Sequence, residues 1–342
     1  MILLPVCFLY LYGIAWQIVE AHYGGGGFDN QIFISIGQGT LSHGYPFETF
    51  RTVSGRAFFD HTPLFAYFLL LPGAIAGSFG PTWGVVAGRM ISAAFGLATV
   101  ILVFMVGRDV RGTVAGLIAA LLVATNLYFV GLSWVMHMEV PMAFFMVLAL
   151  YFLVHERMLS AGIAIAASVM LKEHALGFWF VAGAYVVVWR GWRAALRVTV
   201  PSVVALAIWG LAAYAIDQHE FVRVLRRWMI SVGGENPINP RFHVTMRQWL
   251  ITIAQDIIGP QLGGLTIVAL AVAVLRRHPV PRIVVIPLAY SALALAASVV
   301  LHLKEDRWLT GVIPMAALAV AMLVDWAAVV RWLDLRDPFP RT

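Results

Sequence analysis

The residues of this chain that could do chemistry stand at the ends of its apolar runs. Asp29 follows four glycines, Glu139 begins an apolar run, and Lys172 and Lys304 each follow one. Ionisable groups beside such long apolar segments are costly and are functional candidates by default. Only two of the 23 basic residues are lysines, and a compact ammonium suits a point contact with a phosphate. The pattern indicates a carboxylate and a phosphate-binding cluster.

Composition places these residues in a membrane protein. Of the 342 residues, 61% are hydrophobic and 12% are charged, and the mean hydropathy is +0.86, whereas soluble domains have about 25% charged residues. The single cysteine, Cys7, excludes a disulfide framework and a CxxC metal site. The first 20 residues lack a basic start and a cleavage site, so we expect a retained helix.

The apolar runs are the elements that must position the candidates. Ten runs have roughly the length of a membrane span, although 159–171 is short: 1–20, 89–107, 113–134, 140–154, 159–171, 174–189, 197–216, 250–275, 282–303 and 308–330. An eleventh apolar piece, 62–80, is interrupted by Pro63, Pro72 and three glycines. The sequence predicts an all-α polytopic membrane protein with about 10–11 transmembrane helices.

The piece at 62–80 decides which side each loop faces. If it lies along the membrane surface, the arginine-rich connections fall on one side, as the positive-inside rule favours. That side then carries twelve arginines and five acidic residues, and the other carries eleven basic and twelve acidic residues. The net charge of +6 is therefore a topology signal, and no nucleic-acid partner is expected.

The outer side then has two long loops, 21–88 and 217–249, and the second includes an amphipathic stretch near 220–230. We expect three regions: a transmembrane module over 1–216 that includes the first outer loop, the second outer loop over 217–249, and the last transmembrane helices with a short tail over 250–342.

The order of several segments resembles a known family. It is similar to the polyprenyl-phosphate-dependent glycosyltransferases of the GT-C fold, and most similar to their protein O-mannosyltransferase and lipid A aminoarabinose transferase group. The resemblance extends from residue 1 to about 330 and rests on "FDN", "HTPLFAYFLLLPGA", "GRMISAAFGLATVILVFMVGRDVRG", "TVAGLIAALLVATNLYFVGLSWVMHMEVPMAFFMVLALYFLV", "GIAIAASVMLKEHALG" and "KEDRWLTGVIP".

This resemblance implies roles for the candidates. Asp29 would be the catalytic base, and Glu139 would be a second catalytic carboxylate, at the second outer acidic position. Residues 62–80 would form juxtamembrane helices of the first outer loop. The donor phosphate would lie beside a group of cations, and further residues are possible contacts. The phosphate-binding set is His61, Lys172, Lys304 and Arg307, and the possible contacts are Arg89, His174 and Glu305.

The resemblance also implies the partners. The donor would be a polyprenyl-phosphate sugar, the acceptor a lipid, glycan or protein, and the site would face outward from the plasma (inner) membrane of a bacterium or archaeon, among membrane lipids. No cofactor is required, with a divalent metal as an alternative. The family's loop often reads Asp-Glu, but Asn30 follows Asp29 here, which removes a partner carboxylate.

Structural readings compete with these roles. Asp29 could be the N-cap of an interfacial helix, Glu139 a helix-start acid favoured by the dipole, and each lysine a membrane anchor. His137 and His174 belong to a scattered set of histidines with no HxxH or HExxH spacing. At the level of function, a transporter or flippase and a catalytically silent subunit of a membrane complex are the alternatives to a transferase.

Overall fold

The computed structural model describes residues 3–20, 27–50, 55–59, 61–232, 246–276, 280–300, 309–326 and 328–329. The first part of the chain forms α1 (Leu4–Glu20), α2 (Gly27–His43), β1 (Phe47–Glu48), β2 (Arg56–Ala57), α3 (Leu64–Phe68), α4 (Leu70–Phe79), α5 (Pro81–Arg111), α6 (Thr113–Ala124), α7 (Leu127–Ser133) and α8 (Glu139–Val154). The rest forms α9 (Met158–Leu171), the 3-10 turn η1 (Glu173–Ala175), α10 (Leu176–Arg190), α11 (Trp192–Ile216), α12 (Gln218–Val232), α13 (Met246–Thr252), the π-helix η3 (Ile253–Ile258), α14 (Gly259–Arg276), the 3-10 turn η4 (Arg282–Val284), α15 (Val285–Val300) and α16 (Val312–Leu323).

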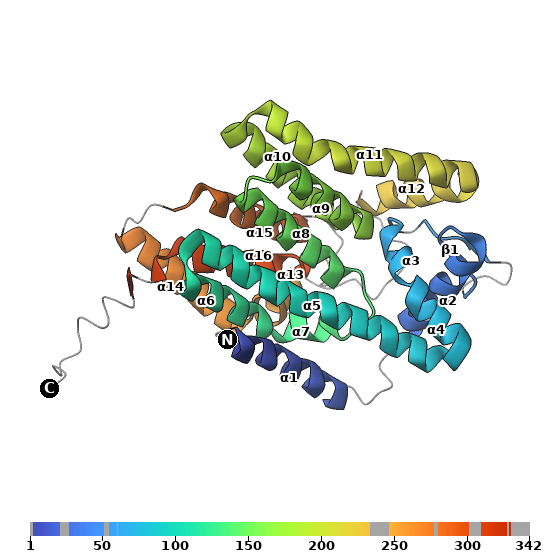
Figure 1. Ribbon diagram of the computed structural model, residues 1–342, viewed down its shortest axis with the longest axis horizontal. Coiled ribbons are helices and arrows are strands. Elements are labelled where there is room, and N and C mark those ends of the chain that lie inside the picture. Colours follow the sequence, from blue (N-terminus) through green and yellow to red (C-terminus); the bar gives the residue numbers. More distant parts are fainter. Residues whose placement is uncertain are drawn as a thin grey trace.

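The described chain is a helical bundle, as predicted, and its core surrounds α8 and α16. Most of α8 is buried, and in α16 only Ala316 is partly exposed. A helix that is apolar on all sides belongs in the interior of a bundle. Helices α5, α6, α9 and α15 pack around this pair (Figure 1).

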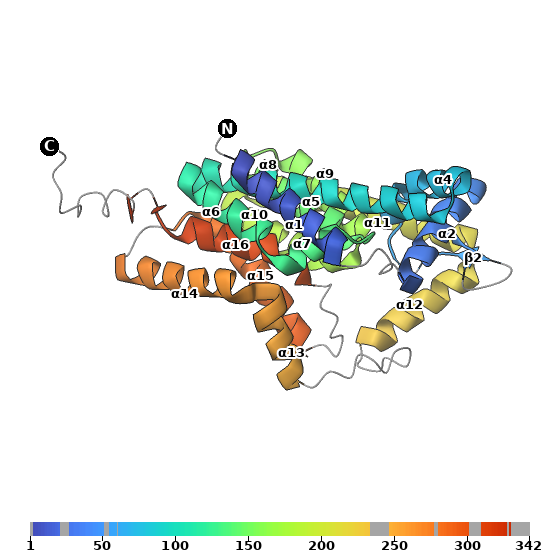
Figure 2. The ribbon, with the colours of Figure 1, turned by 90° about the horizontal axis from the view of Figure 1, so that it is seen from below.

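The helices are more broken than the apolar runs suggest. By length and composition, α5 and α11 can each span a membrane, and the pair α6 and α7 can be counted as a third span bent by 66°. The predicted single run 250–275 is wrong as one helix. It is divided into α13, the π-helix η3 and α14, and the chain changes direction there (Figure 2). Gly259, which starts α14, has a φ of +65°, and such values suit glycine.

The two breaks meet at Asn126. Its side chain caps α7 by accepting a hydrogen bond from the Phe129 backbone N–H at 2.9 Å, and its amide donates to the carbonyl of Ile257 in η3 at 2.9 Å. Asn126 is buried. Because an unsatisfied backbone carbonyl is costly away from water, this one side chain stabilises both irregular segments.

Much of the described part of the first outer loop forms helices. Residues 62–80 form α3 and α4, which lie with α2 and the β1–β2 hairpin at one end of the bundle (Figures 1 and 2). Helices α2 and α4 cross where Gly37 meets Gly73, and a Cβ on Gly37 would lie 2.3 Å from the Leu69 carbonyl oxygen. Small residues permit such close crossings of helices. The predicted amphipathic stretch of the second outer loop is α12, at the same end.

The arginine-rich connections gather at the opposite end. His155 Nε2 lies 3.4 Å from Asp109 Oδ2, Arg190 Nη2 lies 2.5 Å from Glu156 Oε1, and Arg111 donates to the carbonyl of Met322 at 3.0 Å. The predicted alternation of loops between two ends therefore holds for the described residues. Which end faces the cytoplasm stays a prediction.

Candidate active site

A buried ion pair joins the start of α8 to the end of α9. Lys172 Nζ donates to Glu139 Oε1 at 2.5 Å, and the other carboxylate oxygen of Glu139 lies 3.8 Å from His137 Nδ1. The two charged side chains are 5% and 1% exposed. Lys172 reaches this position because α9 ends there and the residue takes an extended conformation before η1. Sequence reasoning placed both residues at a site, and the structure brings them together.

A second polar group lies beside the first. Glu173 Oε1 is 3.5 Å from His61 Nδ1 and 3.7 Å from His174 Nδ1. Glu173 and His174 belong to η1, whereas His61 comes from the first outer loop. The chain after His61 is tied to α9, because Thr62 Oγ1 donates to the Val169 carbonyl at 2.9 Å. We call His61, His137, Glu139, Lys172, Glu173 and His174 the polar cluster.

Charge within the turn between α9 and α10 is set by opposing effects. Burial alone would raise the pKa of Glu173, but His61, His174 and Lys172 outweigh it and lower the pKa to about 2. Burial lowers the pKa of His174 to about 3, against the pull of the Glu173 carboxylate. At neutral pH Glu173 is therefore ionised and His174 is neutral, so His174 offers hydrogen bonds rather than positive charge.

Helix α2 brings the segment of Asp29 to the polar cluster. The Phe33 ring packs edge to face on the His137 ring, with centroids 5.4 Å apart, and on the Phe65 ring of α3, at 5.0 Å. Asp29 lies four residues before Phe33, about one turn, so it occupies the same face of α2. The helix begins at Gly27, which places Asp29 inside the first turn; the structure does not describe its side chain. Asn30 is buried.

Arg89 is a buried cation near the same end. It lies in α5, and its guanidinium carbon is 5.8 Å from the centroid of the Trp134 ring. Its Nε is buried and has no hydrogen-bond partner among the described residues. Next to it, Gly88 contacts Met136, and a Cβ on Gly88 would lie 2.0 Å from the Met136 sulfur. Arg89 therefore borders the segment that carries His137 and Glu139.

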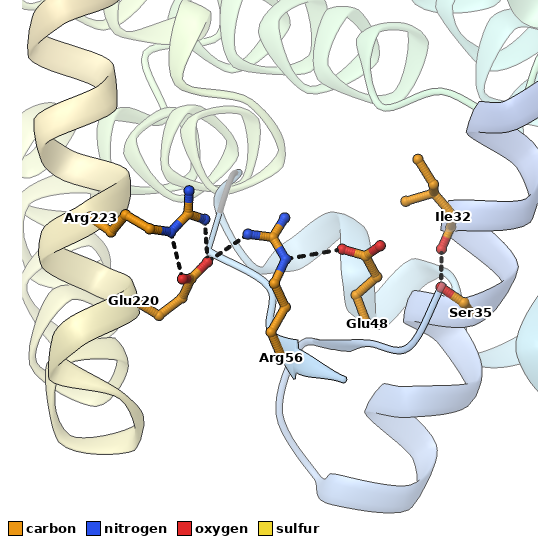
Figure 3. A network of polar contacts seen from close by, with 6 residues as sticks. All are labelled: Ile32, Ser35, Glu48, Arg56, Glu220 and Arg223. Carbon is orange, nitrogen blue, oxygen red and sulfur yellow. Dashed lines mark hydrogen bonds and ion pairs between the residues drawn. The ribbon is translucent and has the colours of Figure 1, made fainter. Parts of the chain in front are cut away.

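Sequence reasoning missed a polar network that joins the two outer loops (Figure 3). We call this network of Glu48, Arg56, Glu220 and Arg223 the clasp. Arg56 of β2 donates from Nη1 to Glu220 of α12 at 2.7 Å and from Nε to Glu48 of β1 at 3.4 Å. Arg223 also binds Glu220, with its Nε 2.7 Å from Oε2. Near this network, Phe59 packs against Trp209 of α11 and Phe221 of α12. No spacing rule links residues 164 positions apart, so only the fold could reveal this contact.

Three predicted site residues, Lys304, Glu305 and Arg307, lie outside the described residues. Where side chains are described, no group of three or more His, Cys, Asp and Glu residues is arranged to hold a metal ion. The polar cluster therefore offers carboxylates, imidazoles and one ammonium, which can move protons and bind an anion.

Part of the chain matches a known protein family. Residues 60–215 match the family described as dolichyl-phosphate-mannose-protein mannosyltransferase. This region contains His61, Arg89, Glu139, Lys172 and His174. A search of curated proteins finds no significant match.

Solved structures share the fold. ArnT from Cupriavidus metallidurans, in the apo state, is similar with a TM-score of 0.64 and 16% identity over 90% of this chain. The same protein bound to undecaprenyl phosphate gives a TM-score of 0.62 and 15% identity over 98% of this chain. The oligosaccharyltransferase AglB from Archaeoglobus fulgidus, in complex with an inhibitory peptide and a dolichol-phosphate, gives 0.57 and 15% identity over 93% of this chain.

This chain covers 57%, 64% and 49% of those three chains, respectively. It therefore has the GT-C fold over a length that corresponds to only part of these proteins.

Proposed function

We propose that the chain is a membrane glycosyltransferase of the GT-C fold that moves a sugar from a polyprenyl-phosphate carrier to an acceptor on the non-cytoplasmic face of the membrane. The acceptor is a lipid, a glycan or a protein hydroxyl. Asp29 is the general base, and the cations of the polar cluster and of the 304–307 segment receive the donor phosphate.

One observation carries this proposal: the first outer loop converges on the buried ends of α8 and α9. Phe33 and His61 of that loop contact His137 and Glu173, respectively. Charged groups are buried there in a chain that is otherwise apolar, and perturbed ionisable groups of this kind concentrate at functional sites. The match over residues 60–215 and the shared fold support the same reaction class.

The reaction needs few groups. The acceptor oxygen attacks the anomeric carbon and forms the new glycosidic bond, while the bond from that carbon to the phosphate oxygen breaks. The bonding electrons leave with the polyprenyl phosphate, and the hydroxyl proton passes to the Asp29 carboxylate. Because the leaving group is already an acidic phosphate, nearby cations stabilise it and no general acid is required.

The test is the rate of donor cleavage by the purified chain. Undecaprenyl-phosphate-linked mannose or aminoarabinose is incubated with the protein and with native membranes as a source of acceptors, and released undecaprenyl phosphate is measured by mass spectrometry. Loss of a general base typically lowers the rate by about 100-fold or more, so we expect Asp29→Asn to lower it by about that factor.

Glu156→Gln is the matched control, because it removes an acid at the opposite end of the bundle, where Glu156 is 61% exposed. We expect it to retain the rate. An unchanged rate for Asp29→Asn would overturn the assignment of the base. Cleavage of neither donor by the unmodified chain would favour the silent-subunit alternative.

A further inference from the structure

Two kinds of arginine lie at the end of the bundle opposite the polar cluster. Arg108 Nε lies 2.8 Å from Asp109 Oδ1, and Arg190 Nη2 lies 2.5 Å from Glu156 Oε1, so each has an acid beside it. Three others are exposed and make no ion pair or side-chain hydrogen bond among the described residues, and we call them the unpaired arginines: Arg157, Arg193 and Arg197. Positive charge at this end is therefore only partly compensated.

The unpaired arginines come from two helices that begin at this end and pack together. Gly162 of α9 meets the α11 backbone so closely that a Cβ on it would lie 2.4 Å from the carbonyl oxygen of Arg197. Arg157 directly precedes α9, and Arg193 is in the first turn of α11, so both lie within about 8 Å of that crossing along the helix axes. Arg193 and Arg197 are four residues apart and share a helix face, where like charges repel. An anion between them would relieve this repulsion.

Exposed apolar side chains continue from the unpaired arginines along both helices. On α11, Trp192 is 64% exposed and Leu196 is 48% exposed, and on α9 Leu159 is 56% exposed. The Arg193 guanidinium carbon lies 5.5 Å from the centroid of the Trp192 ring. Helix α11 lies at an edge of the bundle (Figure 1), so these apolar side chains face the lipid. The surface thus combines cations with an apolar wall, and a phospholipid with an anionic head group has the two matching parts.

We propose that this surface binds an anionic phospholipid, with the phosphate at the unpaired arginines and the acyl chains along the exposed side chains of α9 and α11. A guanidinium fork makes charge-assisted hydrogen bonds to phosphate oxygens. Basic side chains at a membrane surface attract anionic lipids, and each contributes about fivefold in affinity. A free anion would contact only the charges, whereas a phospholipid also contacts the apolar side chains. Because the surface lies at the other end of the bundle from the polar cluster, its lipid binding goes beyond the proposed function and does not depend on it.

The experiment measures the Kd of single phospholipid molecules on the detergent-solubilised chain by native mass spectrometry. Phosphatidylglycerol is compared with phosphatidylcholine, which has the same acyl chains and no net charge. We expect the unmodified chain to bind phosphatidylglycerol more tightly by about tenfold or more. The double variant Arg193→Gln with Arg197→Gln removes two cations, so it should weaken phosphatidylglycerol binding by about 25-fold and leave phosphatidylcholine binding unchanged.

Two single variants test where the lipid lies. Arg157→Gln removes the cation beside the other helix, and we expect it to weaken phosphatidylglycerol binding about fivefold. Arg108→Gln is the matched control, because it removes an arginine that is 46% exposed at the same end but is paired with Asp109. It should change the Kd less than about twofold, since separated surface charges are screened. All four arginines are exposed, so we expect the melting temperatures in lipid-free detergent to match that of the unmodified chain.

Three results would overturn the assignment of a lipid site. One is equal affinity of the unmodified chain for the two phospholipids. Another is a loss with Arg108→Gln as large as that with Arg157→Gln, because net charge alone would then explain the binding. The third is displacement of phosphatidylglycerol by millimolar inorganic phosphate, which would make the surface a site for free anions. None of these results bears on sugar transfer, which the donor-cleavage assay tests separately.

Discussion

The two ends of the bundle hold ion pairs of nearly the same geometry in different surroundings. Lys172–Glu139 and Arg190–Glu156 are both 2.5 Å apart, yet the first pair is 5% and 1% exposed and the second is 45% and 61% exposed. His61–Glu173 and His155–Asp109 also match in distance, at 3.5 and 3.4 Å. Distance therefore does not distinguish the two ends. Burial separates Lys172–Glu139 from Arg190–Glu156, whereas the two histidine pairs, 29% and 11% exposed against 34% and 19%, differ little.

The largest effect should come from breaking the buried pair. Glu139→Gln leaves the Lys172 ammonium buried without its carboxylate, which typically destabilises a protein by about 3–5 kcal/mol. The corresponding change at the other end, Glu156→Gln, should cost about 0–1 kcal/mol. The free energy of unfolding from titration with sodium dodecyl sulfate measures both.

A double variant sharpens this comparison. Glu139→Gln combined with Lys172→Met removes both charges, and we expect it to recover most of the lost stability, since apolar replacements of buried pairs are often neutral. Equal losses at the two ends would contradict the distinction by burial.

A smaller effect on the free energy of unfolding is expected when the pH is lowered. In the unfolded chain His174 takes up a proton below about pH 6.5, whereas in the folded protein its pKa is lowered to about 3. The unfolded state thus binds more protons as pH falls, so the contribution of His174 is fully present above about pH 6.5 and decreases below it. We expect about 2 kcal/mol to be lost between about pH 7.5 and 5, and His174→Gln should abolish this slope. An unchanged slope would contradict the assignment.

The smallest effect concerns the contact between Arg56 and Glu220 in the clasp, which lies at the same end as the polar cluster and is partly exposed. Arg56 is 18% exposed and Glu220 is 12% exposed. Arg56→Ala should lower the free energy of unfolding by about 1–2 kcal/mol, because a partly buried charged hydrogen bond is worth about that much. Proteolysis within α12 should become faster, because the helix loses one of its attachments. If the proteolysis rate equals that of the unmodified chain, the aromatic contacts of Phe59 are sufficient to hold α12 in place.

The sequence predicted the helical fold, and it also pointed to several charged residues that the structure brings together. Glu139 and Lys172 could be proposed because charges in an apolar chain stand out, and the alternation of loops brought them to one end. His61 was proposed from the family resemblance. The roles of Asp29, Lys304 and Arg307 remain predictions, since the structure does not describe their side chains. Glu173 was visible in the sequence but not selected, because only the fold shows that it faces His61.

Other features depend on long-range packing that periodicity does not encode. The division of 250–275 at Gly259–Pro260 could have been suspected, because this pair interrupts an apolar run. The pairing of Arg56 with Glu220 has no such local signal. Each partner lies in a loop whose course is fixed by helices elsewhere, so a single sequence does not relate them.

The contact of Asn126 with Ile257 has a consequence for biosynthesis. A ribosome delivers the corner between α6 and α7 long before it makes the segment 131 residues further on that supplies the carbonyl. Until that segment enters the bilayer, the Asn126 amide has to use water or lipid headgroups as temporary partners. This corner therefore reaches its final state only when the C-terminal half arrives.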